Sequence, residues 1–154
     1  MSERLADDLS LIPIFSTLQP DELHTLEGQL YLRKVAPGEL VFREGEKGDY
    51  LCFVASGNLE VIKLNQGAQP VVISKLAKGS SIGEMALLDR LTRSASVRAA
   101  TASSLVVLTR ESFEHILAEH PAIGIKIMRG IALLLSFNLR KTSDRLAEFM
   151  PSLA

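Results

Sequence analysis

The chain has 154 residues, enough for one domain around a single hydrophobic core, so we expect a single domain over residues 1–154. Its 17 basic and 18 acidic residues give a net charge of −1, and without an overall positive field no nucleic acid partner is expected. No run approaches the roughly 18 consecutive apolar residues of a membrane span, and residues 1–4 do not open a signal peptide, so we expect a cytoplasmic protein with no membrane partner.

Residues 1–30 predict an N-terminal helical segment. Pro20 is followed by Asp21 and Glu22, and this pattern predicts the start of a helix. Acidic side chains in the first turn are stabilised by the positive end of the helix dipole. Short β-branched runs then alternate with turn residues such as Pro37-Gly38. The strands expected are 31–35, 40–42, 50–55, 59–64, 71–76, 96–100 and 105–109. Such a series is typical of a sandwich or barrel, so the fold class is mainly β with flanking helices.

Two C-terminal helices are predicted over residues 110–149. Thr109 is a suitable N-cap for the first, over 110–120, and the longer second helix begins at Pro121. The long helix carries two apolar stripes. One is suited to packing on the β domain and consists of Ile127, Ile131 and Leu134. The other has coiled-coil spacing and consists of Ile125, Met128, Ala132, Leu135, Leu139, Thr142, Leu146 and Phe149. We interpret this second stripe as a homodimer interface; the alternative is packing against the chain's own N-terminal segment.

Residues 79–97 carry the groups best suited to chemistry. A strand is expected to end near Gly83 and a helical turn to begin at Glu84, where free backbone N–H groups attract an anion. Arg93 follows one loop later, beside the small residues Ser94 and Ala95, and its guanidinium can bind a phosphate through two hydrogen bonds. Glu84 would repel a phosphate, so its presence indicates a ligand that also has hydroxyl donors, as a ribose has. The residues alone leave two ordinary alternatives open, a solvated arginine and a first-turn helix charge.

This segment resembles the phosphate-binding cassette of the cyclic-nucleotide-binding domain family, which includes bacterial catabolite activator proteins, regulatory subunits of cAMP-dependent protein kinase and cyclic-nucleotide-gated channels. The family pattern of Gly-Glu, a short apolar helix and Arg with small residues is matched by Gly83-Glu84, residues 85–88 and Arg93-Ser94-Ala95. Matches at residues 37–39, 45–49 and 57–61 extend the resemblance over about residues 10–148.

The resemblance implies a β-roll, a double-stranded β-helix or jelly-roll barrel, over residues 31–109 with its cassette at 82–97. It implies that Glu84 accepts a hydrogen bond from a ribose 2′-OH and that Arg93 pairs with a cyclic phosphate. The ligand implied is cAMP, with cGMP as the alternative; Ser94 favours cAMP, because some cGMP-selective relatives carry Thr there. The full set of implied ligand-binding residues is Ile82, Gly83, Glu84, Met85, Ala86, Arg93, Ser94 and Ala95.

The resemblance also gives the long helix a role as a cap over the base. In the catabolite activator branch a Thr-Ser pair on this helix contacts adenine, and Thr142-Ser143 resemble it. They lie about one turn further from the His-Pro start, so Asn138 and Arg145 are alternative base contacts. No helix-turn-helix follows the helix, so the chain is not expected to bind DNA.

Catalysis and metal binding are not expected. His24, His115 and His120 are scattered, and no metal-ligand spacing or nucleophile motif is present. Cys52 lies among apolar residues and is expected to be a small buried hydrophobe. We predict a regulatory sensor domain without its own DNA-binding or catalytic domain, acting on an unidentified protein partner. The alternative is an interaction module whose nucleotide pocket is empty.

Overall fold

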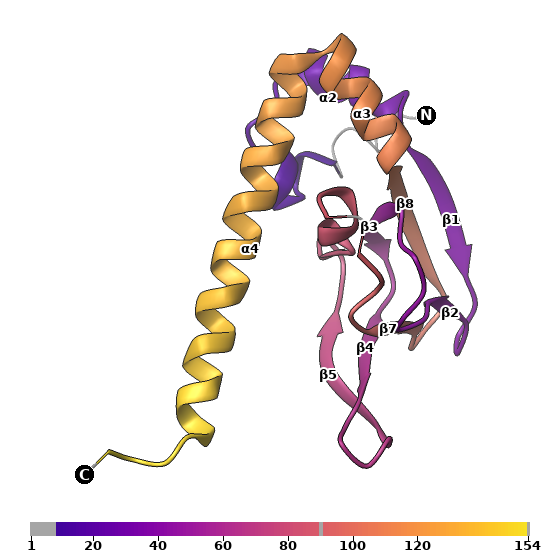
Figure 1. Ribbon diagram of the computed structural model, residues 1–154. Coiled ribbons are helices and arrows are strands. Elements are labelled where there is room, and N and C mark those ends of the chain that lie inside the picture. Colours follow the sequence, from indigo (N-terminus) through magenta and orange to yellow (C-terminus); the bar gives the residue numbers. More distant parts are fainter. Residues whose placement is uncertain (1–8, 90, 154) are drawn as a thin grey trace.

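The computed structural model describes residues 9–89 and 91–153 as a β-roll flanked by helices (Figure 1). The elements in chain order are η1 (Pro13–Phe15), α2 (Pro20–Glu27), β1 (Tyr31–Val35), β2 (Leu40–Phe42), β3 (Tyr50–Ser56), β4 (Leu59–Leu64), β5 (Pro70–Leu76), β6 (Ser81–Ile82), η2 (Glu84–Leu87), β7 (Ser96–Ala99), β8 (Ser103–Thr109), α3 (Arg110–Glu119) and α4 (Pro121–Phe149). The part of the predicted N-terminal segment over residues 1–8 lies outside the described residues.

The strands form two four-stranded antiparallel sheets, with the orders β1-β8-β3-β6 and β2-β7-β4-β5. This arrangement confirms the predicted β-roll with flanking helices. Strand β8 begins at Ser103, two residues before the predicted start. Strand β6 is missing from the predicted series of runs, because two residues are too few to show an alternating pattern, but it ends just before Gly83, where the sequence predicted the end of a strand.

Strand β3 is buried on both faces. Its residues Leu51 and Phe53 belong to a hydrophobic core shared with the helices, whereas Cys52 and Val54 belong to a second core between the two sheets. The sheet containing β3 is therefore the middle layer of the domain. Burial raises the pKa of the Cys52 thiol to about 12, so Cys52 is the protonated, buried hydrophobe that its neighbours predict.

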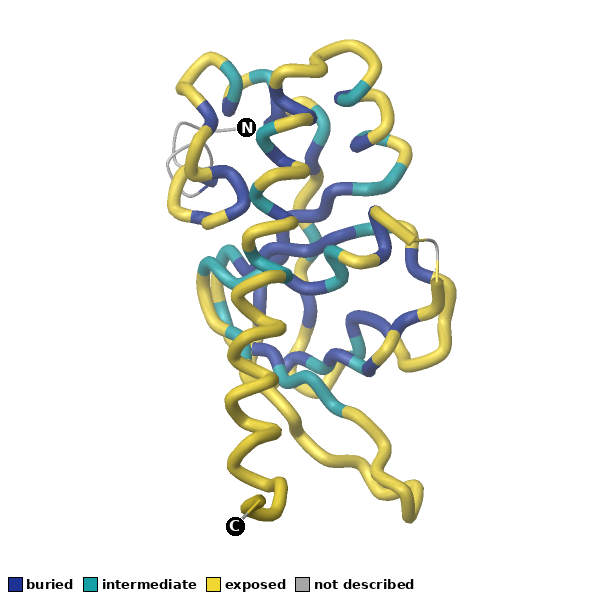
Figure 2. Tube along the Cα trace, turned by 60° about the vertical axis from the view of Figure 1, so that its left-hand side comes forward, coloured by how far each residue is buried: buried dark blue, intermediate teal, exposed yellow. Residues whose placement is uncertain are grey.

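Helix α4 is packed over its first half and exposed over its second. Ile123, Ile127 and Ile131 are buried in the core that the helices share with the middle sheet, and Leu134 packs against its edge. The Nζ atom of Lys126 lies 2.5 Å from an Oε1 atom of Glu22 in α2, which ties the two helices together. From Ser136 to Phe149 every residue is exposed, and the same contrast is visible along the helix in Figure 2. The distal part of the second apolar stripe is therefore uncovered by the described residues.

By length and composition alone, α4 is apolar enough to cross a membrane, with a mean hydropathy of 1.6 over its most apolar 18 residues. The sequence expectation considered only uninterrupted apolar runs and so overlooked this helix. Length and apolar composition alone are weak evidence for a span, because core helices of globular proteins share them. In this structure 22% of that stretch is buried, through Ile123, Gly124, Ile127 and Ile131, so packing in the core accounts for part of its apolar character.

Candidate ligand-binding site

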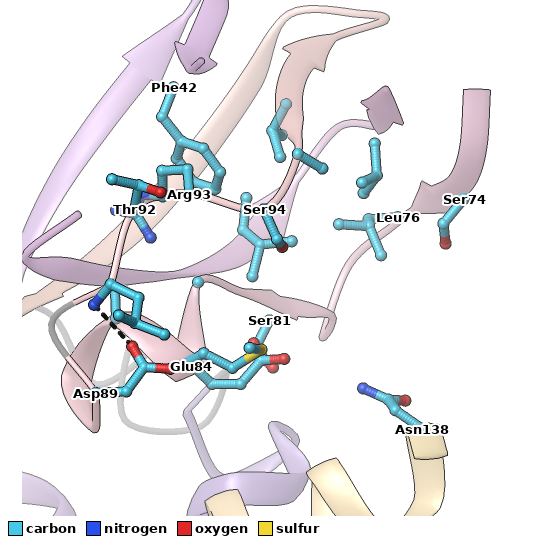
Figure 3. A pocket seen from close by; sticks show the side chains of 18 residues that line it. Phe42, Ser74, Leu76, Ser81, Glu84, Asp89, Thr92, Arg93, Ser94 and Asn138 are labelled. Atoms are coloured by element: carbon cyan, nitrogen blue, oxygen red, sulfur yellow. Dashed lines mark hydrogen bonds between the residues drawn. The ribbon is translucent and has the colours of Figure 1, made fainter. Parts of the chain in front are cut away.

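A pocket of about 340 Å³ opens between the β-roll and α4 (Figure 3). The loop between β6 and β7, containing η2, forms most of its wall. All eight ligand-binding residues implied by the sequence line this one pocket: Ile82, Gly83, Glu84, Met85, Ala86, Arg93, Ser94 and Ala95. The remaining wall comes from β2, β4, β5, β6, β7 and α4, through Phe42, Val61, Ser74, Leu76, Ser81, Val97 and Asn138.

Arg93 is 5% exposed, so it is not the solvated surface arginine that the sequence left open as an alternative. Its guanidinium carbon lies 3.9 Å from the centre of the Phe42 ring and 4.6 Å from that of Tyr50. Its Nη2 donates a 2.9 Å hydrogen bond to the Tyr50 carbonyl oxygen. Its Nε and Nη1 are buried and have no hydrogen-bond partner. Burying unpaired donors of a charged group is costly, so this pair is suited to an anion that accepts two hydrogen bonds.

Two glycines make room for the Arg93 side chain. A Cβ atom on Gly48 would lie 2.4 Å from Arg93 Nε, and one on Gly83 would lie 2.4 Å from Arg93 Nη1. Gly83 also has φ 82°, a left-handed conformation in which a side chain is strained. The sequence argument assigned the space at Gly83 to the ligand, whereas in the structure the guanidinium occupies it.

Glu84 is half-buried at the start of η2, and its Oε2 has no hydrogen-bond partner. Burial raises the pKa of its carboxyl group, while a hydrogen bond from its own backbone N–H and the charge of Arg93 oppose the rise. A free carboxylate oxygen in a pocket accepts hydrogen bonds but donates none. Glu84 is therefore suited to a ligand hydroxyl, next to the anion position at Arg93.

The rest of the cassette supplies positioning contacts. The Ser94 carbonyl oxygen accepts a 2.7 Å hydrogen bond from Lys63 Nζ on β4. The backbone of Arg93 is bonded on both sides to the loop before β3, through Glu46 and Gly45. This double attachment fixes where the Arg93 side chain leaves the loop.

Sequence reasoning missed Arg110, the first residue of α3. Its guanidinium donates to the carbonyl oxygen of Ala86 in η2 and, over 2.9 Å, to that of Gly48. Phe42 and Tyr50 were missed too, although arginine commonly stacks on aromatic rings. No local pattern marks these three residues, because their contacts join segments 24 or more residues apart.

Of the four α4 residues considered as base contacts, Asn138 lines the pocket. Thr142, Ser143 and Arg145 are exposed further along the helix and do not line it. Elsewhere in the described part of the chain, no group of three or more His, Cys, Asp or Glu side chains gathers in a way that could hold a metal ion.

Comparison with known proteins gives a consistent assignment. Residues 32–120 match the family model described as "Cyclic nucleotide-binding domain". The chain is 36% identical over 107 residues to a cAMP-dependent protein kinase regulatory subunit of Blastocladiella emersonii, covering 70% of this chain and 27% of that protein. It is 31% identical over 129 residues to the cyclic AMP receptor protein of Thermus thermophilus, covering 84% of this chain and 58% of that protein. The chain belongs to the cyclic nucleotide-binding domain family.

Solved structures support the same family assignment. A cyclic nucleotide-binding domain from Methylobacillus flagellatus superposes with a TM-score of 0.89 at 27% identity, covering 98% of this chain and 88% of that one. The matched domain is a ligand-binding module that is not itself catalytic. The chain spans about a quarter of the kinase subunit and just over half of the receptor.

Proposed function

We propose that this chain is a cAMP-binding sensor domain. One observation carries the proposal: a single pocket contains a buried guanidinium with two unpartnered N–H groups and a half-buried carboxylate with an unpartnered oxygen. A ribose cyclic phosphate satisfies both groups, because its phosphate oxygens accept from Arg93 and its 2′-OH donates to Glu84. The names of the two curated relatives, a regulatory subunit dependent on cAMP and a cyclic AMP receptor, support cAMP over cGMP.

In this proposal the base lies toward α4, where Asn138 lines the pocket. Ser94 and Ala95 complete the phosphate site beside Arg93. A ligand that contacts both the roll and α4 binds better to the conformation in which these contacts are made, and so shifts the position of α4. The exposed stripe of α4 is proposed to pair with that of a second copy, and the response reaches a protein partner through this helix.

The test is calorimetric titration of the protein with cAMP and cGMP, with Arg93→Ala and Arg98→Ala as variants. Arg98 is a matched control, because it lies nearby on β7, forms a 2.8 Å ion pair with Glu60 and does not line the pocket. We expect wild type and Arg98→Ala to bind cAMP alike, at micromolar concentration or below. Arg93→Ala loses two charged hydrogen bonds, so its affinity should fall about a hundredfold or more. Unchanged binding by Arg93→Ala would show that the site is assigned wrongly.

Absence of heat with both nucleotides would instead favour an interaction module with an empty pocket. A thermal melt gives an independent measurement, because a ligand that binds the native state raises its melting temperature. A melting temperature unmoved by a large excess of either nucleotide would support that alternative. Recovery of intact cAMP after prolonged incubation would exclude its hydrolysis by this chain.

A further inference from the structure

We propose that Phe42 and Tyr50 are positioning residues for Arg93, and that Arg33 acts through Tyr50 as the third member of the same aromatic support. The support holds the Arg93 guanidinium in place in the unliganded protein, so that the phosphate site is preformed. The inference rests on the proposed function, because the anion that Arg93 binds is taken to be a cyclic phosphate. The sequence singled out none of the three supporting residues.

The guanidinium of Arg93 lies against two aromatic rings at once. Its central carbon is 3.9 Å from the centre of the Phe42 ring and 4.6 Å from that of Tyr50. The two ring centres are 6.2 Å apart and the ring planes meet at 74°, so the rings form a corner. A guanidinium is weakly hydrated and stacks well on aromatic faces, and the corner therefore offsets part of the cost of burying this charge.

The contacts within this corner leave two donors of Arg93 available to a ligand. Aromatic rings attract the charge without accepting a conventional hydrogen bond, and the Tyr50 carbonyl oxygen accepts from Nη2. Nε and Nη1 have no hydrogen-bond partner among the described residues. The side chain is thus held before binding, and a ligand is spared the entropic cost of ordering it.

Arg33 on β1 fixes the Tyr50 ring through its hydroxyl group. The Nη1 atom of Arg33 donates to the Tyr50 hydroxyl oxygen over 3.3 Å and to the Val41 carbonyl oxygen over 3.2 Å. The Tyr50 hydroxyl donates to the same Val41 carbonyl oxygen over 3.1 Å. These three bonds form a closed triangle that joins β1, β2 and β3. Because Val41 directly precedes Phe42, the triangle also fixes the backbone that carries the second ring.

Two measurements test the rings, calorimetric titration with cAMP and the NMR signal of the Arg93 Nε–H proton in the unliganded protein. Phe42→Leu removes one ring but keeps an apolar side chain. Ordering Arg93 then falls to the ligand, so we expect the cAMP affinity to drop about fivefold. The Nε–H signal, identified by its loss in Arg93→Ala, should lose its upfield ring-current shift in Phe42→Leu.

Phe113→Leu is the matched control, because Phe113 is a buried phenylalanine in the core that the helices share with the middle sheet. It should lower the free energy of unfolding and leave both the affinity and the Arg93 signal unchanged. An equal loss of affinity in Phe113→Leu and Phe42→Leu would reflect general destabilisation and would overturn the positioning role.

A double-mutant cycle tests Arg33. Tyr50→Phe removes the hydroxyl and keeps the ring and its carbonyl, and Arg33→Met removes the donor to that hydroxyl. We expect each change to lower the cAMP affinity about threefold, as loss of one hydrogen bond in the support gives. The double variant should bind no more weakly than either single variant, since both changes break the same connection. Additive losses would show that Arg33 acts by another route, such as its charge, and would overturn its place in the support.

The outcomes separate the two proposals. If wild type and Phe42→Leu bind cAMP equally, the aromatic support is overturned while the sensor proposal stands. If wild type binds no cAMP, the sensor proposal fails, and the Arg93 signal alone decides the support. A signal shifted in wild type but not in Phe42→Leu would then uphold the support, and the same signal in both proteins would overturn it.

Discussion

The position of Arg93 depends on residues that have no side chain. An ordinary Cβ contact is 3.4 Å or longer, yet a Cβ on Gly48 would lie 2.4 Å from Arg93 Nε. We therefore expect Gly48→Ala to displace the guanidinium and to lower cAMP affinity about tenfold or more, since hydrogen bonds to a charged group would be misaligned. Calorimetric titration measures the change. Gly28→Ala is the control, because a Cβ there has only an ordinary contact at 3.5 Å, and equal affinities of the two variants would contradict the prediction.

Glu84 makes the stability of the unliganded protein depend on pH. Burial raises the pKa of its carboxyl group above the ordinary value of 4.5. As pH rises above that value, the unfolded chain loses the proton before the folded protein does, so the folded state binds more protons and its stability falls. Glu84→Gln cannot ionise, so its free energy of unfolding should rise relative to wild type across this window.

Urea unfolding of both proteins, from pH about 4.5 to pH about 7.5, measures this difference. Glu39→Gln removes a carboxylate at an exposed position and serves as the control. A Glu84→Gln difference that stays constant with pH would contradict the assignment of the buried carboxyl as the source.

At the scale of elements, the docking of α4 depends on one close backbone approach. A Cβ on Gly130 would lie 2.4 Å from the Ile14 carbonyl oxygen in η1, and backbone atoms there cannot rotate away. Ala favours a helix over Gly by about 1 kcal/mol, whereas overpacking costs about 1–3 kcal/mol. We expect the clash to dominate, so that Gly130→Ala lowers the free energy of unfolding by about 1 kcal/mol.

Gly124→Ala provides the comparison, measured by the same denaturant unfolding. A Cβ on Gly124 would meet the Cδ2 atom of Leu117 at 2.5 Å, and that atom is the flexible end of a side chain. Its cost should be smaller, and the helix preference of Ala should offset part of it. Equal losses in the two variants would show that the contact with η1 does not control how α4 docks.

The elements themselves were largely predictable, and the contacts between them were not. Strands 31–35, 40–42 and 59–64 and the long helix 121–149 were predicted with the bounds that the structure has, because glycine and proline punctuation marks their ends locally. That the cassette residues would lie close together was predictable because their motif is local too, and they line one pocket. The aromatic contacts of Arg93 come from β2 and β3, and the folded roll alone brings Phe42 and Tyr50 beside it. Likewise Ser74 lines the pocket because β5 pairs with β4 in a register that places it opposite Val61, and no local sequence signal marks that register.

At the scale of the whole molecule, the pocket and the helices are joined at Arg110. Its guanidinium bonds to η2 through Ala86 and to the loop at Gly48, which itself packs against Arg93. Arg110 begins α3, and α4 follows α3 directly. Under the proposed function, a change of the cassette on ligand binding therefore has a short covalent and hydrogen-bonded route to the helix whose distal half is uncovered.

That uncovered half leads to the prediction for assembly. Leu139, Leu146 and Phe149 are 70%, 58% and 84% exposed and recur at coiled-coil spacing. In a monomer these apolar side chains remain in contact with water, which is unfavourable. The described N-terminal residues pack against the first half of α4 instead, so they do not cover this stripe.

We expect the wild-type chain to sediment as a dimer, and the double variant Leu139→Gln with Leu146→Gln to sediment as a folded monomer. Arg140→Gln with Lys141→Gln changes exposed neighbours outside the stripe and should stay dimeric. The pairing of two α4 helices would be contradicted if the wild-type chain stayed monomeric at about 100 times the protein concentration used for calorimetry.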